Sequence, residues 1–503
     1  MAWRNGCVNR LALAAMITWV CATPATAAID ADKALTLKPC RLAGIAHEIR
    51  CGSIKRPLDP SKPEGVQIDV HYAVLPSMAR HKLPDPVFLL AGGPGQSAID
   101  IAPNVAPWFT RLNNRRDIVF VDQRGVGRSA PLECPEPEGL SAAQAADPVA
   151  EMHRLDNCRS SLQKLPYGDL RQFATHIAVR DFDAVRQQLG ATQVNVVGGS
   201  YGTRAALEYA RQFPQQVRRM VIDGVAPPDM ALPASFSKDG QAALDALFKS
   251  CEDSPACAKP YPRLREQWRS LLHSLPRSIT VANSLTGEPE TFTLSPDILL
   301  RMVRMPLYQP NAASALPYAI SQAHQGRFES LLGLTNQNSS KHANKQIAMG
   351  MHFSVICSED MPRVAQSKDA AGADFADVEA RMYEQVCRNW PRATIPTQFY
   401  QIAPSLAGTL VLSGAIDPVT PPRHGERVAQ ALGAKAKHVV VAQAGHGVMT
   451  IGCMRDVVFS FIDAANDTEA LAVKTDCAGK VPRPPAFLPV KPSAQTGKAS
   501  EVR

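Results

Sequence analysis

The sequence lacks the short patterns that mark several common classes of site. It contains no Cys-x-x-Cys pair and no His-x-x-x-His array, so a zinc site is not expected. The glycine-rich stretch GGPGQS, residues 92–97, has neither spacing that is typical of a phosphate-binding loop. The net charge of +8 is spread over residues of both signs, without a dense Lys/Arg stripe between aromatic residues. Nucleic acid is therefore not expected as a partner.

Long apolar runs are also scarce, and no segment after the N-terminus is long and apolar enough to cross a bilayer. Residues 1–28 carry Arg4 and Arg10 without an acid, then the apolar run 11–20, then small residues around Thr26. This order is typical of a cleaved export signal. A membrane anchor is the alternative, but the run is short for a span. We expect an exported protein, periplasmic or secreted, with no stable membrane insertion after cleavage.

Cysteine usage agrees with export. Two of the twelve cysteines lie in the signal region, and the other ten are an even number. In an exported chain this indicates a disulfide framework. The ten cysteines fall as sequential neighbours, which predicts the pairs Cys40–Cys51, Cys134–Cys158, Cys251–Cys257, Cys357–Cys387 and Cys453–Cys477.

Short apolar runs recur along the chain and end in glycine or turn residues. The run 68–76 alternates like a half-buried strand, whereas the others resemble strands buried on both faces, over residues 86–95, 117–125, 194–202, 217–225, 408–417 and 438–447. Helical patterns over 176–190 and 203–213 fall between them. This alternation predicts an α/β fold with a mostly parallel central sheet and helices on both faces.

The alternation stops after about residue 230 and resumes near residue 408, and the pattern between is helical. We interpret this block as an inserted, mainly helical cap. The predicted organisation is a signal peptide over 1–28, the first part of the core over 29–230, the cap over 231–404, the second part of the core over 405–479 and a Pro-rich tail over 480–503.

The stretch GGSYG, residues 198–202, fits the pattern G-x-S-x-G between a predicted strand and a predicted helix. That context places Ser200 on a tight turn above a sheet, where it could act as a nucleophile. A serine needs a base and a group that orients the base. A glycine-rich turn without chemical importance is the alternative. The choice between the two depends on whether the sequence also offers a base and an acid that orients it.

In this architecture an acid and a histidine follow the nucleophile, in that order. Asp417 ends one late strand, and His446 follows the last strand between two glycines. His438 is the nearest competitor for the base, but it starts a strand. Gly93, in the glycine-rich loop after an early strand, and Tyr201, directly after the nucleophile, could supply backbone amides to an oxyanion. Such a triad requires no metal or organic cofactor.

The motifs GGPG (92–95), DQRGVGRS (122–129), GGSYG, GAIDPVTP (414–421) and GHG (445–447) together resemble the prolyl and tripeptidyl aminopeptidase family of α/β-hydrolases. The signal region and paired cysteines bring the chain closer to the exported, tripeptidyl-aminopeptidase-like branch. The resemblance implies an α/β-hydrolase fold and structural roles for Asp122 and Arg124. Ala91 and Gln96 depart from the proline-specific pattern around GGPG, which argues against a strict preference for proline.

The resemblance implies release of N-terminal residues or short peptides from substrates with a free N-terminus. Such an enzyme must recognise an ammonium group. The adjacent acids Glu359 and Asp360, near the cysteine at 357, are candidates for that role, with a solvated acidic turn as the alternative. An esterase or other small-molecule hydrolase with the same triad is the second hypothesis for function. A binding protein that has lost catalysis is the third.

Overall fold

A computed structural model describes residues 37–489, except positions 136, 138–139, 284–285, 337–346 and 370. The predicted signal peptide over residues 1–28 and residues 490–503 of the predicted tail lie outside the described residues.

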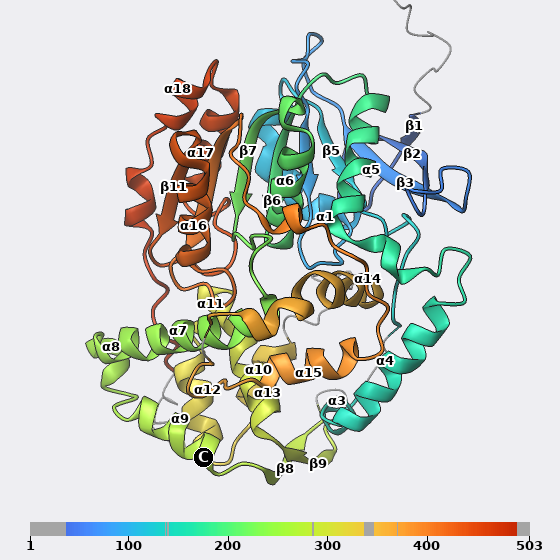
Figure 1. The fold of residues 1–503 in the computed structure, drawn as a ribbon. Helices are drawn as coiled ribbons and strands as arrows, with labels where there is room; N and C mark the ends of the chain where they lie inside the picture. Colours follow the sequence, from blue (N-terminus) through green and yellow to red (C-terminus); the bar gives the residue numbers. More distant parts are fainter. Residues whose placement is uncertain are drawn as a thin grey trace, which may run out of the picture. The chain divides into compact units, whose positions relative to one another are not determined.

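The predicted strand rhythm forms one nine-stranded sheet in the order β1-β2-β3-β5-β4-β6-β7-β10-β11 (Figure 1). The six strands from β5 to β11 in this order are parallel, and β1, β2 and β3 extend the sheet antiparallel at one side. The strands are β1 Lys38–Cys40, β2 Ile49–Pro57, β3 Gln67–Leu75, β4 Val87–Leu90, β5 Ile118–Val121, β6 Val194–Gly199, β7 Val217–Asp223, β10 Gly408–Gly414 and β11 Ala436–Val441. The predicted α/β fold is confirmed, whereas β1 and β2 were not predicted.

Helices cover both faces of the sheet, because its central strands are apolar on both sides. The inner side chains of α5 (Thr175–Gln188), α6 (Tyr201–Gln212) and α16 (Pro422–Leu432) share one apolar cluster with one face. Those of α1 (Ala98–Val105) and α17 (Met454–Asp463) pack on the other face. The two layers hold the carboxyl ends of the parallel strands at one edge.

The inserted block contains a second apolar core around Phe248 and Trp268. Besides helices, it contains the hairpin β8 (Arg277–Ala282) and β9 (Pro289–Leu294), which the helical pattern did not predict. The helices of this part are α7 Leu232–Glu252, α8 Pro255–Ala258, α9 Leu264–His273, α10 Pro296–Leu307, α11 Pro310–Ala313, α12 Leu316–His324 and α13 Glu329–Asn336.

The later part of the block packs against the sheet side instead. Met351 on α14 (Met349–Val355), Cys357 on the π-helix η5 (Ile356–Asp360) and Tyr383 on α15 (Val378–Cys387) belong to the same apolar cluster as α5 and α6. Two helices from the predicted core join them: α3 (Ala142–Ala145) contacts β9, and α4 (Pro148–Leu162) contacts α14 and α15. The cap is thus built from two separate segments of the chain.

All five predicted disulfides are formed, between Cys40 and Cys51, Cys134 and Cys158, Cys251 and Cys257, Cys357 and Cys387, and Cys453 and Cys477. Each closes a short sequence interval, as their order along the chain suggested. Across the described ranges, no helix combines the length and the apolar character that crossing a membrane requires.

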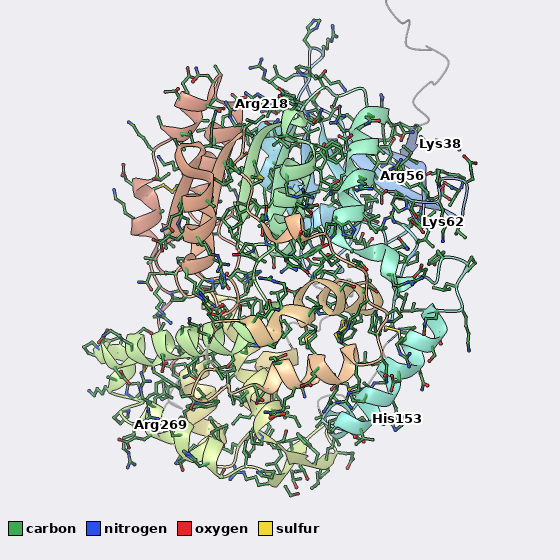
Figure 2. The ribbon with its side chains drawn as sticks, in the orientation of Figure 1. Lys38, Arg56, Lys62, His153, Arg218 and Arg269 are labelled. Atoms are coloured by element: carbon green, nitrogen blue, oxygen red, sulfur yellow. A yellow bond between two sulfur atoms is a disulfide. The ribbon has the colours of Figure 1, made fainter. Side chains whose placement is uncertain are left out.

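The basic side chains are dispersed over the molecule (Figure 2). The labelled examples lie on separate elements: Lys38, Arg56 and Lys62 on or next to β1 and β2, His153 on α4, Arg218 on β7 and Arg269 on α9. Many basic groups are also neutralised locally, such as Arg56 by Asp181 at 3.0 Å.

Candidate active site

Ser200 occupies a sharp turn between β6 and α6. Its backbone adopts φ 54° and ψ −124°, an unusual conformation for a residue with a side chain. Its amide donates to the carbonyl of Asp223 at 2.8 Å, which ties the turn to the end of the neighbouring strand β7. The predicted strand-turn-helix context of G-x-S-x-G is therefore present, with Ser200 partly exposed at its apex.

The two outer glycines of this motif permit close approaches that a side chain would block. A Cβ on Gly202 would lie 2.1 Å from the carbonyl oxygen of Leu90 in β4, and a Cβ on Gly198 would lie 2.4 Å from the carbonyl oxygen of Gly202. Helix α6 therefore starts directly against two adjacent strands. This packing fixes the direction in which Ser200 leaves the sheet.

Asp417 and His446 meet at the ends of β10 and β11. Nδ1 of His446 donates to Oδ2 of Asp417 at 2.8 Å, and the carboxylate is fully buried, whereas the imidazole is 17% exposed. Oδ1 of Asp417 accepts from the amides of Val419 and Thr420, and the hydroxyl of Thr420 donates to Oδ2 at 2.7 Å. These bonds fix the carboxylate, which in turn orients the imidazole.

The electrostatics of this pair suit a general base. Burial by itself would raise the pKa of Asp417, but the attraction of His446 and the hydrogen bonds to the carboxylate leave that pKa below its ordinary value. Burial lowers the pKa of His446, but the neighbouring Asp417 outweighs it and leaves that pKa raised. Asp417 thus stays ionised and favours the protonated imidazole.

A strand-end residue that the sequence analysis missed links Ser200 to His446. Asp223 ends β7, is buried, and accepts from the amides of Val448 and Met449 at 2.8 Å, just after His446. The next residue, Gly224, is so close to the imidazole that a Cβ there would lie 3.1 Å from Cε1 of His446. The sequence signal of Asp223, an acid at the end of a predicted strand, is the one that was used to find Asp417.

Within the described residues, neither the hydroxyl of Ser200 nor Nε2 of His446 makes a hydrogen bond. Such bonds are often long in ligand-free enzymes and shorten when substrate binds. Nδ1 is held by Asp417, and both Ser200 and the imidazole adjoin the Asp223–Gly224 turn. Among the described residues, Nε2 is therefore the ring nitrogen of His446 that is left without a hydrogen-bond partner.

The loop that carries Gly93 follows β4, directly beside Ser200. Gly93 and Gly95 have φ of 110° and 112°, which residues with a side chain avoid. A Cβ on Gly92 would lie 3.1 Å from Cβ of Ser200, so the loop contacts the nucleophile closely. Tyr201 is the first residue of α6, where a backbone amide has no partner within the helix. Gly93 is thus next to a residue that contacts Ser200, and Tyr201 follows Ser200 directly in the chain.

Asp122 and Arg124 occupy buried positions that support this loop, as the resemblance implied. Asp122 accepts from the hydroxyl of Ser97 at 2.7 Å and the amide of Ile99 at 3.1 Å, at the start of α1. Burial raises the pKa of Asp122 to about 6. Arg124 donates to Asp181 at 2.7 Å and 3.0 Å. Asp122 thus anchors the segment that follows the loop, whereas Arg124 ties the segment after β5 to α5.

The prediction that Glu359 and Asp360 bind a substrate ammonium is corrected by the structure. Their side chains are fully buried and pair with Arg204 of α6, at 3.2 Å from Glu359 and 2.9 Å from Asp360. Glu359 also accepts from the amide and hydroxyl of Thr175, and Asp360 from the amide of Leu232. Burial raises the pKa of Glu359 to about 7. The pair joins the cap to the core and leaves no access for a substrate.

The cap contributes its own residues to the site, and none of them was predicted. Tyr308, at the end of α10, accepts the amide of His446 at 2.9 Å, and its ring packs edge-on against the imidazole with centroids 5.3 Å apart. Arg304 on the same helix lies 3.5 Å from the Tyr308 hydroxyl and pairs with Glu379 of α15 at 3.1 Å. The cap therefore contacts the candidate base directly through Tyr308, which Arg304 and Glu379 support.

Among the residues that the structure describes, no cluster of three or more His, Cys, Asp or Glu side chains could hold a metal ion. The chemistry available is that of a hydroxyl, an imidazole, a carboxylate and backbone amides.

Two family models match separate parts of the chain. One, described as alpha/beta hydrolase fold, covers residues 85–250 and includes Gly93 and Ser200. The other, described as TAP-like protein, covers residues 373–470 and includes Asp417 and His446.

Several named relatives resemble the chain. Serine protease Hip1 of Mycobacterium tuberculosis is 26% identical over 434 residues, which cover 78% of this chain and 82% of that protein. Tripeptidyl aminopeptidase of Streptomyces lividans is 32% identical over 194 residues, 36% of each chain. A Mycobacterium tuberculosis protein named carboxylesterase B is 27% identical over 415 residues, which cover 76% of this chain and 78% of that protein.

Proposed function

The chain belongs to the TAP-like α/β-hydrolases, which are serine hydrolases, and from this premise we propose that it is an exported peptidase that releases N-terminal residues or short peptides. One observation carries the proposal. His446 is held by Asp417 at 2.8 Å, and Ser200 stands on a strained turn at the end of β6 in the same sheet. The names of the relatives support peptide bonds as the substrate class.

In the proposed mechanism, the oxygen of Ser200 attacks the peptide carbonyl while His446 takes its proton. Asp417 stabilises the imidazolium, and the amides of Gly93 and Tyr201 stabilise the oxyanion. His446 then gives the proton to the departing amine, and the C–N bond breaks to leave an ester on Ser200. Water, deprotonated by His446, hydrolyses that ester. The close approach of Gly92 to Ser200 and the place of Tyr201 at the start of α6 support this assignment.

The proposal also needs a group that binds the substrate ammonium, and we assign that role to Glu379. Its Oε1 accepts from Arg304 at 3.1 Å, whereas Oε2 makes no hydrogen bond within the described part of the chain. Arg304 contacts Tyr308, which packs on His446. Glu379 is thus a carboxylate of the cap that retains a free oxygen and is linked to the candidate base.

A panel of fluorogenic mono-, di- and tripeptide amides, each with a free or a blocked N-terminus, tests the peptidase proposal. We expect turnover of free peptides only, loss of nearly all turnover in Ser200→Ala, and labelling of Ser200 by a fluorophosphonate in the unmodified enzyme. Wild-type rates for Ser200→Ala would contradict the assigned nucleophile. The number of residues released is read from the peptide length that gives the highest kcat/KM.

The ammonium site is tested by Glu379→Gln, with Glu384→Gln as the control, because Glu384 lies exposed on the same helix. We expect Glu379→Gln to raise KM for free peptides by about 10-fold or more, since a charge-assisted hydrogen bond is worth about 1.5–3 kcal/mol. Ester hydrolysis with a blocked N-terminus should change little in either variant. Equal KM values for free peptides in both variants would place the ammonium site elsewhere.

Esterase activity is the second candidate function, and the relative named carboxylesterase B is the observation that favours it. The same triad would cleave small esters without any ammonium site. If esters are cleaved well and free peptides are not cleaved at all, the esterase is the correct assignment.

Export is proposed on two observations. The five disulfides are stable only in an oxidising compartment, and the residues preceding the described chain have the composition of a signal. Fractionation of producing cells should find the protein outside the cytoplasm with its N-terminus near residue 29. Recovery of a full-length, reduced cytoplasmic protein would overturn this part of the proposal.

A further inference from the structure

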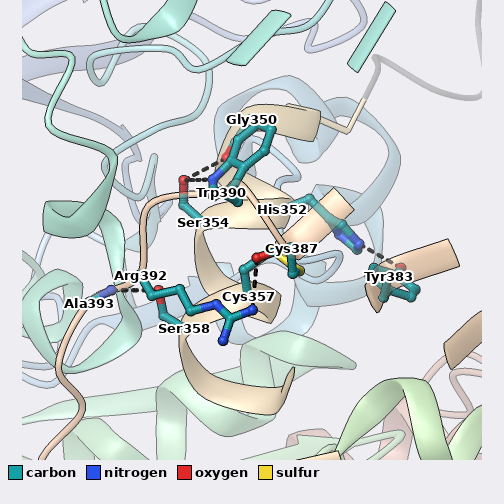
Figure 3. Close-up of a disulfide and its surroundings, with 10 residues drawn as sticks. All are labelled: Gly350, His352, Ser354, Cys357, Ser358, Tyr383, Cys387, Trp390, Arg392 and Ala393. Atoms are coloured by element: carbon teal, nitrogen blue, oxygen red, sulfur yellow. Dashed lines mark hydrogen bonds between the residues drawn. A yellow bond between two sulfur atoms is a disulfide. The ribbon is translucent and has the colours of Figure 1, made fainter. Parts of the chain in front are cut away.

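A second histidine, outside the proposed triad, is buried between the cap and the glycine-rich loop. His352 lies on α14 and is 9% exposed. Its Nδ1 lies 3.0 Å from the carbonyl oxygen of Pro94, and its Nε2 lies 2.8 Å from the hydroxyl of Tyr383 on α15. Figure 3 shows the imidazole directed at the Tyr383 side chain, beside the disulfide that joins the two segments. The proposed mechanism gives this imidazole no role.

The two contacts define which atoms carry the protons. The carbonyl of Pro94 can only accept, so Nδ1 of His352 is the protonated nitrogen. Burial lowers the pKa of His352, which favours the neutral ring, and burial raises the pKa of the Tyr383 phenol. In the neutral ring Nε2 accepts, so the Tyr383 hydroxyl donates to it. The result is a directed chain from Tyr383 through His352 to the carbonyl of Pro94.

The loop that receives the hydrogen bond of His352 has one internal hydrogen bond, from the amide of Gln96 to the carbonyl of Gly92 at 3.3 Å. Two of its glycines adopt left-handed backbone conformations, where the chain has few steric restraints. Its place therefore depends on neighbours. From the core, Asp122 and Ser97 hold the helix that follows it. From the cap, the amide of Ala348 donates to the carbonyl of Gly95 at 2.9 Å, and His352 donates to Pro94.

The two cap segments that carry His352 and Tyr383 are joined to each other. The disulfide between Cys357 and Cys387 joins η5, which continues α14, to the end of α15. Nε1 of Trp390 donates to the hydroxyl of Ser354 at 3.1 Å, which ties the same two segments together (Figure 3). The backbone segments that carry His352 and Tyr383 are thus cross-linked to each other.

We propose that His352 is a positioning residue for the oxyanion site: it holds the carbonyl of Pro94, and through it the amide of Gly93, from the cap. Tyr383 fixes the tautomer that makes this bond. The inference rests on the proposed function only in taking Gly93 as an oxyanion donor. A displacement of about 1 Å in such a donor can reduce the rate by about 100-fold, so the loss of one of the hydrogen bonds that hold the loop should have a measurable effect.

The test uses four variants of the full chain. His352→Leu removes both hydrogen bonds, His352→Asn keeps a donor near the position of Nδ1, and Tyr383→Phe removes only the hydroxyl. Trp390→Phe is the matched control, because it removes a hydrogen bond between the same two segments without contacting Pro94. For each variant, kcat and KM for an N-blocked ester, the affinity for a boronic acid that mimics the tetrahedral intermediate, and the melting temperature are measured.

We expect His352→Leu to lower kcat and boronate affinity together by about 10- to 100-fold, with KM changed less than about twofold. His352→Asn should recover most of the loss, and Tyr383→Phe should show a smaller loss. Trp390→Phe should lower the melting temperature and leave kcat unchanged. If His352→Leu does not fold, the Asn and Phe variants carry the same comparison.

Unchanged kcat and boronate affinity in His352→Leu would overturn the inference, as would losses in Trp390→Phe of the same size. Labelling by a fluorophosphonate separates this failure from failure of the proposed function. If the unmodified enzyme is labelled at Ser200, the proposed function stands even when the His352 prediction fails. If it is not labelled, both the proposed function and the role of His352 are contradicted.

Discussion

The carboxylate of Asp223 accepts hydrogen bonds from the backbone amide of Val448 at 3.0 Å and 2.8 Å, and so ties the end of β7 to the loop that carries His446. The backbone carbonyl of Asp223 accepts the amide of Ser200. One residue therefore contacts the segments of both the proposed nucleophile and the proposed base. Its position explains how side chains far apart in the sequence are held at one edge of the sheet.

Asp223→Asn should reduce kcat by about 10-fold or more, because an amide can offer only one acceptor oxygen to the two backbone donors. The loss of a charge-assisted bond should cost about 1–3 kcal/mol in the free energy of unfolding. Asp85→Asn is the control, since Asp85 is also buried and paired, with Arg116 at 3.0 Å, but precedes β4 at the opposite edge. It should lower stability with kcat unchanged. Equal kcat losses in both variants would contradict a specific role for Asp223.

The same carboxyl should make stability depend on pH. Burial raises the pKa of Asp223 to about 6, above its value of about 3.9 in the unfolded chain. The stability that this group contributes is therefore fully present below about pH 4 and is lost as the pH rises through about 6. Urea unfolding of the unmodified enzyme and Asp223→Asn across this window should show a smaller decline in the variant. If the free energy of unfolding falls equally with pH in both proteins, Asp223 is not the group that causes the fall.

Asp417→Asn should lower kcat on the order of 10⁴-fold, because the amide cannot stabilise the imidazolium. Thr420→Val should cost about 10-fold, since it removes the hydroxyl that donates to Oδ2 of Asp417 at 2.7 Å. Thr420→Ser keeps that hydroxyl and should retain most of the activity. Steady-state kinetics with an N-blocked ester measures all three. A Ser variant as slow as the Val variant would show that the methyl group, not the hydroxyl, matters.

The pH dependence of kcat/KM should report on His446. The protonated imidazole cannot accept the proton of Ser200, so the rate rises as the pH passes through the pKa of His446. The attraction of Asp417 outweighs the effect of burial and raises that pKa, which places the midpoint above the ordinary value of about 6.5. An N-blocked ester has no ammonium group to titrate, so with this substrate the rise in kcat/KM that is due to His446 is observed alone. Residual activity in Asp417→Asn should titrate at a lower pH, and a midpoint that does not move would contradict the pairing.

The disulfides should differ in their effect on stability according to the loops they close. The Cys357–Cys387 bond spans 30 positions, and Cys251–Cys257 spans 6. The loop-entropy relation predicts losses of about 3–4 and about 2 kcal/mol when each pair is replaced by alanine. Chemical denaturation of the two double variants measures the difference. A larger loss from the shorter loop would mean that packing, rather than chain entropy, dominates.

Much of the framework followed from local patterns. The runs around Val196 and Val411 predicted buried strands, and the carboxyl ends of parallel strands share one edge, so Ser200, Asp417 and His446 could be proposed as neighbours from their order alone. Cysteine pairing followed from sequential spacing for the same reason: each disulfide closes a short interval. The strand β2 escaped prediction because its side chains are mostly half-exposed and carry little apolar signal.

What the sequence determined by itself was the parallel strands of the sheet and the strand-turn-helix context of Ser200, because each depends on residues close together in the chain. Only the tertiary structure decided that Glu359 and Asp360 are buried against Arg204, some 155 residues away, and that His352 joins Tyr383 to the glycine-rich loop. Burial and the choice of ionic or hydrogen-bond partner depend on contacts between distant segments, which no local pattern encodes.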